Sequence, residues 1–147
     1  MNKEGTDYLI GFTTNKGLML DLDKTTMKEA KQIAVYYCKK FKLEGYMVIR
    51  SSPFNYHVIF NKYLQWRTTC EYLMKIAWRY YYHEHGEKAG LIRWCMLQIC
   101  KQTETLRISK KYKKSRPHII EESGKTNKLI RDYREYIQIM NRTTEKE

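Results

Sequence analysis

Alternating hydrophobic and polar positions predict several short strands along the chain. In residues 18–23, three leucines alternate with Met19, Asp21 and Asp23, so one face of this strand is apolar and the two aspartates share the other. A similar pattern predicts strands over 7–13 and 103–109, with a further short one at 117–120. Residues 46–51 and 56–61 are β-prone and joined by the turn-forming stretch SSPFN, which predicts a hairpin.

Hydrophobic positions recurring every three to four residues predict the helices. The first begins at Thr26, where Thr26 and Glu29 form a capping box, and Gly45 stops it. A second helix is expected over 63–83 and a last one over about 127–140. The inner stripe of the second helix is Trp66, Cys70, Leu73, Ala77 and Tyr80. Residues 91–99 are apolar almost throughout, which fits either a buried strand or a short helix.

The predicted order of elements, β-β-α-β-β-α-β-β-α, indicates an α+β fold. We expect a mainly antiparallel sheet backed by two or three helices. The 147 residues, 42% of them hydrophobic, are enough for one domain with a core of its own. That domain is expected over residues 1–142, followed by a polar C-terminal tail at 143–147.

The chain is strongly basic, with 28 Lys and Arg against 16 Asp and Glu and a net charge of +12. This excess favours a polyanionic partner, and nucleic acid over an anionic membrane. Hydrophobic runs stay short of the roughly 18 residues of a membrane span, and the N-terminus lacks the apolar stretch of a secretory signal, so we expect a cytoplasmic protein. The four cysteines form no C-x-x-C pair and are expected to be buried free thiols rather than zinc ligands or disulfides.

Asp21 and Asp23 are the first candidates for chemistry. Two carboxylates on one side of a strand end repel each other unless a cation lies between them, which favours Mg²⁺ or Mn²⁺ bound together with substrate phosphates. The alternative is that Asp21 faces solvent and Asp23 only helps to cap the following helix. His57 is the second candidate, because alternation places it with Ile59 on one strand face. A histidine in that position can also be a structural hydrogen-bonding group.

A basic run between residues 101 and 116 is the third candidate. It contains one acid, Glu104, and is either a solvated face or a surface that binds the nucleic-acid backbone, with Tyr112 able to stack on a base. Its basic residues are Lys101, Arg107, Lys110, Lys111, Lys113, Lys114 and Arg116.

The stretch His83-Glu84-His85 is similar to the paired histidines of rolling-circle endonucleases, which also use a tyrosine on a helix. Tyr133 and Tyr136 would be the candidate tyrosines. A polar helix terminus is the alternative explanation of these residues. Glu84 or Glu87 could also act with the aspartates around a nuclease metal.

The strand ending in Asp21-Leu22-Asp23, followed by the small-residue turn and strand that lead to His57, resembles the first two motifs of the archaeo-eukaryotic primase superfamily. The resemblance covers residues 18–60 and implies an RRM-like palm. It implies that Asp21 and Asp23 hold Mg²⁺ or Mn²⁺, and that His57 contacts the phosphates of the incoming nucleotide. Ser51 and Ser52 belong to the same phosphate-binding turn. Arg107 resembles the family's later phosphate-binding arginine.

The family's third motif is an aspartate on a later strand, and no aspartate occurs between Asp23 and Asp132. Glu104 and Gln98 are the nearest substitutes, with Glu104 as the candidate third metal ligand. The leading hypothesis is therefore a primase-like nucleotidyltransferase in the replication of an archaeal virus or plasmid. It would act on DNA rather than RNA, use nucleotides and work beside a replication helicase. The alternatives are a metal-dependent nuclease and a non-catalytic nucleic-acid-binding module with a degenerate palm.

Overall fold

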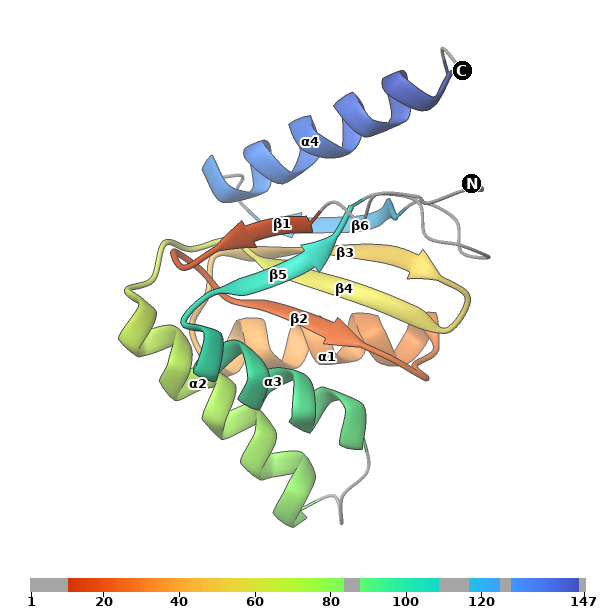
Figure 1. Ribbon diagram of the computed structural model, residues 1–147. Helices are drawn as coiled ribbons and strands as arrows, with labels where there is room; N and C mark the ends of the chain where they lie inside the picture. The colour runs from red at the N-terminus through yellow and green to blue at the C-terminus, as the bar shows by residue number, and fades with distance from the viewer. Residues whose placement is uncertain (1–10, 84–87, 109–116, 125–127, 146–147) are drawn as a thin grey trace.

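The computed structural model of the chain describes residues 11–83, 88–108, 117–124 and 128–145, with side chains up to residue 140 in the last range. Its architecture is α+β, as predicted (Figure 1). In chain order the elements are β1 (Gly11–Thr14), β2 (Met19–Leu22), α1 (Met27–Lys40), β3 (Gly45–Ser52), β4 (Asn55–Phe60), α2 (Trp66–Trp78), a π-helical turn (Arg79–His83), α3 (Ala89–Lys101), β5 (Glu104–Arg107), β6 (His118–Gly124) and α4 (Lys128–Glu145).

The main sheet has four antiparallel strands in the order β2-β4-β3-β6. The predicted hairpin is present as β3 and β4, and β2 pairs with β4 although α1 and β3 lie between them in the chain. A second sheet pairs β1 with β5, and β5 lies beside the free edge of β2. The sequence predicted this β-α-β-β arrangement, which places residues of β2 and β4 opposite each other.

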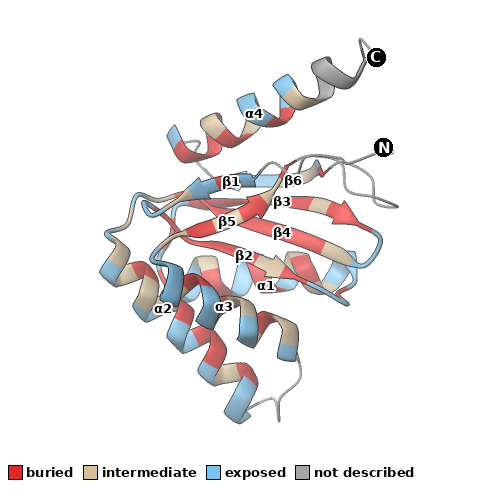
Figure 2. Ribbon diagram, in the orientation of Figure 1, coloured by how far each residue is buried: buried red, intermediate tan, exposed pale blue. Residues whose placement is uncertain are grey.

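Each face of the main sheet is covered by helices, so the core has two parts. Leu18, Leu20 and Leu22 pack on one side, against α1, α2 and α3, which lie together below the sheet in Figure 1. On the other side, Met19, Met47 and their neighbours on the sheet pack beneath α4. Figure 2 shows the buried positions concentrated along the strands and the inward sides of the helices. The alternation predicted for residues 18–22 is confirmed.

The first helix begins where its cap predicts. The Thr26 hydroxyl accepts the N–H of Glu29, whose carboxylate accepts the N–H of Thr26 in return. The last helix continues to Glu145, beyond the end at about Met140 that its hydrophobic pattern indicates. No helix of the described residues is long and apolar enough to cross a membrane.

The ambiguous apolar stretch at 91–99 is a helix, α3. Its buried residues are Leu91, Cys95 and Gln98, which recur at helical spacing and face α2 and β2. In α2 the predicted inner stripe is buried at Leu73 and Ala77. The cysteines are free thiols as predicted, but of the four only Cys95 is buried, as was expected for all of them. Cys38 and Cys70 are half-buried, and Cys100 is exposed because it lies on the outer side of α3.

Candidate functional site

Asp21 and His57 face each other across the antiparallel pair β2–β4. They are direct register partners, and the Asp21 Oδ1 atom lies 3.6 Å from the His57 Nε2 atom. The carboxyl side chain is 29% exposed, whereas the imidazole is only 5% exposed. Asp21, Asp23 and His57 are expected on adjacent strands facing one cleft, and the structure confirms this for Asp21 and His57 but not for Asp23. The pair is reachable from solvent on the Asp21 side.

Arg107 reaches the same place from β5. Its guanidinium donates a hydrogen bond to the backbone carbonyl oxygen of Ser51 at 2.7 Å, and it lies close enough to Asp21 to feel its charge. Partial burial lowers the pKa of Arg107, and the negative charge of Asp21 opposes that shift. Arg107 is still a cation at neutral pH, because a guanidinium group does not lose its proton in proteins. An acid, an imidazole and a guanidinium from three strands therefore meet here.

Ser51 and Ser52 end β3 at its turn into β4, and they contribute backbone atoms to the site as well as hydroxyl groups. Ser51 and Ser52 are both buried, and the Ser52 Oγ atom accepts a 2.6 Å hydrogen bond from the Asn55 side-chain amide. Phe54 has a left-handed backbone, with φ of 63°, which closes the turn between the two strands. The Ser52 hydroxyl is thus already used in holding the turn, and the Ser51 carbonyl binds Arg107.

Asp23 lies apart from Asp21 and His57. The alternation of β2 ends at Leu22, and the chain turns at once through Lys24, whose φ is 50°. As a result the Asp23 Oδ2 atom lies 3.8 Å from where a Cβ on Gly90 would be, at the start of α3. The positive end of that helix favours a carboxylate there. Asp23 is not the cap of α1, since Thr26 fills that role.

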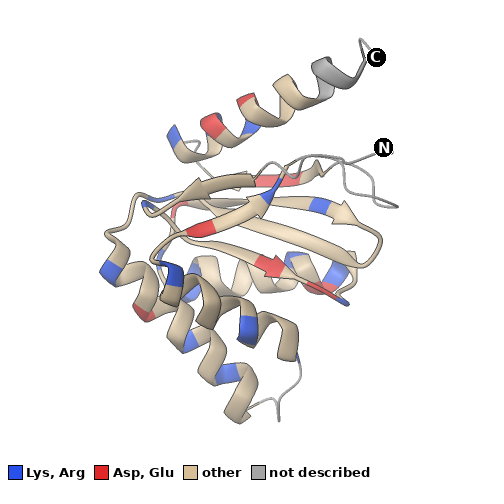
Figure 3. Ribbon diagram, in the orientation of Figure 1, with Lys and Arg blue, Asp and Glu red and all other residues tan. Residues whose placement is uncertain are grey.

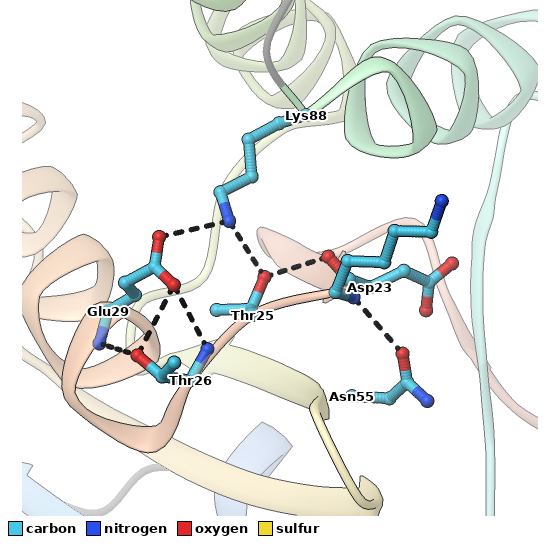
Figure 4. A network of polar contacts seen from close by, with 7 residues as sticks. Asp23, Thr25, Thr26, Glu29, Asn55 and Lys88 are labelled. Atoms are coloured by element: carbon cyan, nitrogen blue, oxygen red, sulfur yellow. Dashed lines mark hydrogen bonds and ion pairs between the residues drawn. The ribbon is translucent and has the colours of Figure 1, made fainter.

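A polar network fixes the loop that carries Asp23 (Figure 4). The Thr25 hydroxyl donates to the Asp23 carbonyl oxygen, and the Lys24 N–H donates to the Asn55 side chain. The Lys88 ammonium binds both the Thr25 hydroxyl, at 3.1 Å, and the Glu29 carboxylate, at 3.2 Å. The network joins the starts of α1 and α3 to the β3–β4 turn. The role of Lys88 is not evident from the sequence, because its partners Thr25 and Glu29 lie far away in the chain.

Glu104, the candidate third metal ligand, is directed elsewhere. It is completely buried, and its Oε2 atom accepts the backbone N–H of Met19 at 2.9 Å. Burial raises the pKa of Glu104 well above the ordinary value, which favours the neutral form of the side chain. A neutral carboxyl inside the core is a poor ligand for Mg²⁺. The signal for this burial was in the sequence, since Glu104 alternates with Leu106 and Ile108, and both of those residues are buried.

The residues at Asp21 fit a divalent cation only in part. Across residues 11–83, 88–108, 117–124 and 128–140, no three His, Cys, Asp or Glu side chains come together as a ligand set. Asp21 alone supplies the exposed carboxylate next to His57. Mg²⁺ in phosphoryl-transfer sites is held by one or two carboxylates together with substrate phosphates, so Asp21 suits an ion that arrives with its nucleotide.

Other predicted site residues fall at the margins. Lys101 is exposed at the end of α3, where its ammonium reaches the Thr105 hydroxyl at 3.4 Å. Tyr133 is fully buried, so Tyr136 is the exposed one of the two candidate tyrosines. His83 is exposed at the end of the π-turn. The remaining predicted residues lie outside the described ones: Lys110, Lys111, Tyr112, Lys113, Lys114, Arg116, Glu84, His85 and Glu87.

Sequence analysis gave no function to the outward side of α2 and the turn that follows it. Trp78, Tyr81 and Tyr82 are each more than half exposed there. The signal that could have found them is the placement of large aromatic residues away from the predicted inner stripe.

Comparison of the chain with protein-family models, with curated proteins and with solved structures finds no match.

Proposed function

We propose that this protein binds nucleic acid and nucleotides, and that it acts as a primase-like, metal-dependent nucleotidyltransferase in the replication of a mobile element. The observation that carries the proposal is the meeting of Asp21, His57 and Arg107 from β2, β4 and β5. An arginine and an imidazole beside a partly exposed carboxylate suit a nucleotide triphosphate that brings a divalent cation with it.

The chain's own residues have distinct roles in this proposal. Arg107 is held by the Ser51 carbonyl, and the rest of its donor fork would orient the phosphates. His57 would donate a hydrogen bond to a phosphate oxygen, and its Nε2 atom lies beside Asp21. Asp21 would hold Mg²⁺ or Mn²⁺, which lowers the pKa of an attacking 3′-hydroxyl and neutralises charge on the phosphates. The net charge of +12 favours binding of the template.

A second candidate is a nucleic-acid-binding module that does not catalyse. Two observations favour it: Glu104 is completely buried and held by the Met19 N–H, and Asp23 is directed toward the start of α3 rather than toward His57. Two-metal catalysis uses several carboxylates around the reacting phosphate. Asp21 alone among the described residues is placed to serve in that way.

The test is extension of labelled oligonucleotides on a DNA template with nucleotides and Mg²⁺ or Mn²⁺. Nucleotidyl transfer gives longer products, a nuclease gives shorter strands without any need for nucleotides, and a binding module gives neither. Asp21→Asn should reduce extension by on the order of 100-fold or more, because it removes the charged ligand. The matched control is Asp132→Asn, which removes a carboxylate paired with Lys128 on α4, remote from the site in sequence and exposed.

A direct measurement of nucleotide binding separates the two candidates further. Titration with a nucleoside triphosphate and Mg²⁺ should give weaker binding for Asp21→Asn and for Arg107→Lys than for the wild type. If the wild type gives no product of any kind and Asp21→Asn binds triphosphate as tightly as the wild type, the catalytic proposal is wrong.

A further inference from the structure

We infer that the outward side of α1, α2 and the π-turn carries a second site, which binds single-stranded nucleic acid by stacking bases on Trp78 and Tyr82 and by pairing phosphates with the lysines beside them. The site is a groove of about 670 Å³ lined by Tyr36, Lys40, Lys75, Trp78, Arg79 and His83. The inference deepens the proposed function, because it gives the position of the bound nucleic-acid strand. It rests on the proposed function only for the class of ligand, which is nucleic acid.

The aromatic part of the site is exposed, with Trp78 lining the groove and Tyr82 stacked against Trp78 beside it. Trp78 and Tyr82 are 57% and 63% exposed, and their rings stack with centroids 5.0 Å apart and planes inclined by only 8°. Tyr81 packs edge-on against Trp78. The π-turn at Arg79–His83 is wider than an α-turn, so that residues on it are spaced differently from those on α2. Exposed, parallel rings are the platforms on which unpaired bases stack.

The charged part of the groove surrounds a third ring. The Arg79 guanidinium lies 4.0 Å from the centroid of the Tyr36 ring, and the Lys40 ammonium lies 5.7 Å from the same centroid. Lys75 contributes another cation to the groove, and its Nζ atom lies 3.5 Å from the Oε1 atom of Glu71 on the preceding turn of α2. Basic residues outnumber acidic ones along α1, α2 and α3 (Figure 3). Cations next to stacking rings suit a phosphate backbone that carries unpaired bases.

This groove is distinct from the place where Asp21 and His57 meet. The helices α1 and α2 pack on the leucine side of the main sheet, whereas α4 packs on the opposite side (Figure 1). The chain neighbours of Asp21 and His57 face α1, α2 and α3; these are Leu20, Leu22, Tyr56 and Val58. Because side chains alternate along a strand, Asp21 and His57 lie on the opposite face of the sheet. A strand on the groove would therefore be held on the side of the sheet opposite to the nucleotide.

A duplex does not suit this surface, since its bases are already stacked and its phosphates alone would be in reach. A neighbouring apolar groove of about 550 Å³ lies on the other side of Trp78, with Met74, Ile92 and Met96 among its lining residues. A protein partner would use that apolar groove. The cations gathered on the Tyr36 side of Trp78 favour a polyanion there, and so we commit to nucleic acid.

The experiment is fluorescence anisotropy with labelled oligo(dT) and oligo(rU) of about 15 residues, with the full chain at several salt concentrations. Trp78→Ala and Tyr82→Ala should each weaken binding by about five- to 150-fold, the range for loss of one stacked base. Trp78→Phe keeps a ring and should restore most of the affinity. The matched control is Tyr63→Ala, which removes another half-exposed tyrosine, one that is neither a lining residue of the groove nor one of the rings packed on Trp78. The two oligonucleotides distinguish DNA from RNA.

The contribution of Lys40 and Lys75 is measured separately, by the dependence of affinity on salt concentration. Lys40→Ala combined with Lys75→Ala should reduce the slope of log affinity against log salt by up to about 1.4, or about 0.7 for each lost phosphate contact on a single strand. Lys28→Ala, at the other end of α1, is the control and should leave the slope unchanged.

Wild-type affinity in both Trp78→Ala and Tyr82→Ala would overturn the inference, as would absence of oligonucleotide binding by the wild type. Conversion of a wild-type dimer to a monomer by Trp78→Ala, with oligonucleotide affinity unchanged, would also overturn it and assign the face to a second copy of the chain. Asp21→Asn should leave oligonucleotide affinity unchanged. Loss of triphosphate binding in that variant therefore tests the proposed function independently.

Discussion

The carboxyl group of Glu104 accepts the backbone N–H of Met19 at 2.9 Å, and this hydrogen bond joins β5 to the free edge of β2. An acidic side chain thus takes the place of a neighbouring strand's carbonyl at the edge of the main sheet. The bond is inside the core, where Glu104 has no exposed surface. The residue that the sequence suggested as a metal ligand instead connects the two sheets.

Glu104→Gln should make the protein more stable at neutral pH. The raised pKa of Glu104 means that the folded chain holds the proton to higher pH than the unfolded chain, in which the group ionises near the ordinary value of 4.5. The stabilisation from the neutral acid is therefore complete below pH 4.5 and is lost as the pH rises toward the folded-state pKa. Glutamine cannot ionise and still accepts the Met19 N–H. Urea unfolding at several pH values should show an advantage for the variant that grows above pH 4.5; a difference independent of pH would contradict this.

Arg107→Ala should lower the free energy of unfolding by about 1.5 to 3 kcal/mol, the usual worth of a hydrogen bond to a charged group. The change leaves the Ser51 carbonyl without its 2.7 Å partner. Arg107→Lys keeps the charge but not the donor fork, so it should recover part of the stability and little of the triphosphate binding. Unfolding by urea and nucleotide titration measure the two effects separately. Equal triphosphate affinity for arginine and lysine at this position would show that only the charge matters.

Thr26→Ala should cost about 0.5 to 2 kcal/mol of stability, since the hydroxyl caps the first turn of α1. Thr26→Ser keeps the capping oxygen and should retain most of that stability. Glu29→Gln is a second control, because glutamine can also complete a capping box. Thermal or urea unfolding of the three variants checks the prediction. A loss in Thr26→Ser as large as in Thr26→Ala would mean that the methyl group, not the cap, is responsible.

Neutralising the basic run should change salt dependence. Alanine at Lys110, Lys111, Lys113 and Lys114 should weaken binding of nucleic acid and flatten its dependence on salt, by up to about one unit of slope for each lost contact with duplex DNA. These residues lie outside the described part of the chain, so binding data are the direct test. Duplex and single-stranded probes compared in this variant and in the Lys40, Lys75 double variant would show which surface each ligand uses. Unchanged affinity and slope would place the backbone-binding face elsewhere.

The features predicted correctly have local causes. Thr26 and Glu29 are three residues apart, and their reciprocal hydrogen bonds need nothing from the rest of the chain. The hairpin likewise depends on a short turn between two β-prone segments. The pairing of Asp21 with His57 was also predictable, because a β-α-β-β unit commonly places its first and third strands side by side and alternation then fixes the face.

The features that were not predicted depend on tertiary contacts. Asp23 was expected to continue the alternation of Asp21, but the strand ends at Leu22 and the backbone turns at Lys24. Residues 91–99 have no polar face strong enough to distinguish helix from strand, and packing between α2 and β2 decides the matter. Lys88 bonds to Thr25 and Glu29 from more than fifty positions away in the chain, as the hydrogen bonds show.

The pairing of β1 with β5 determines when the candidate site can form during folding. Gly11 pairs with Arg107, and every element from β2 to α3 lies between them in the chain. Closing so long a loop has an entropic cost that is recovered only after the intervening elements are in place, so β1 and β5 should dock after the β3–β4 hairpin and the helices. Hydrogen exchange should then show their opening at a lower free energy than that of β3 and β4. Because Arg107 lies on β5, the proposed nucleotide site would be complete only in the last stage of folding.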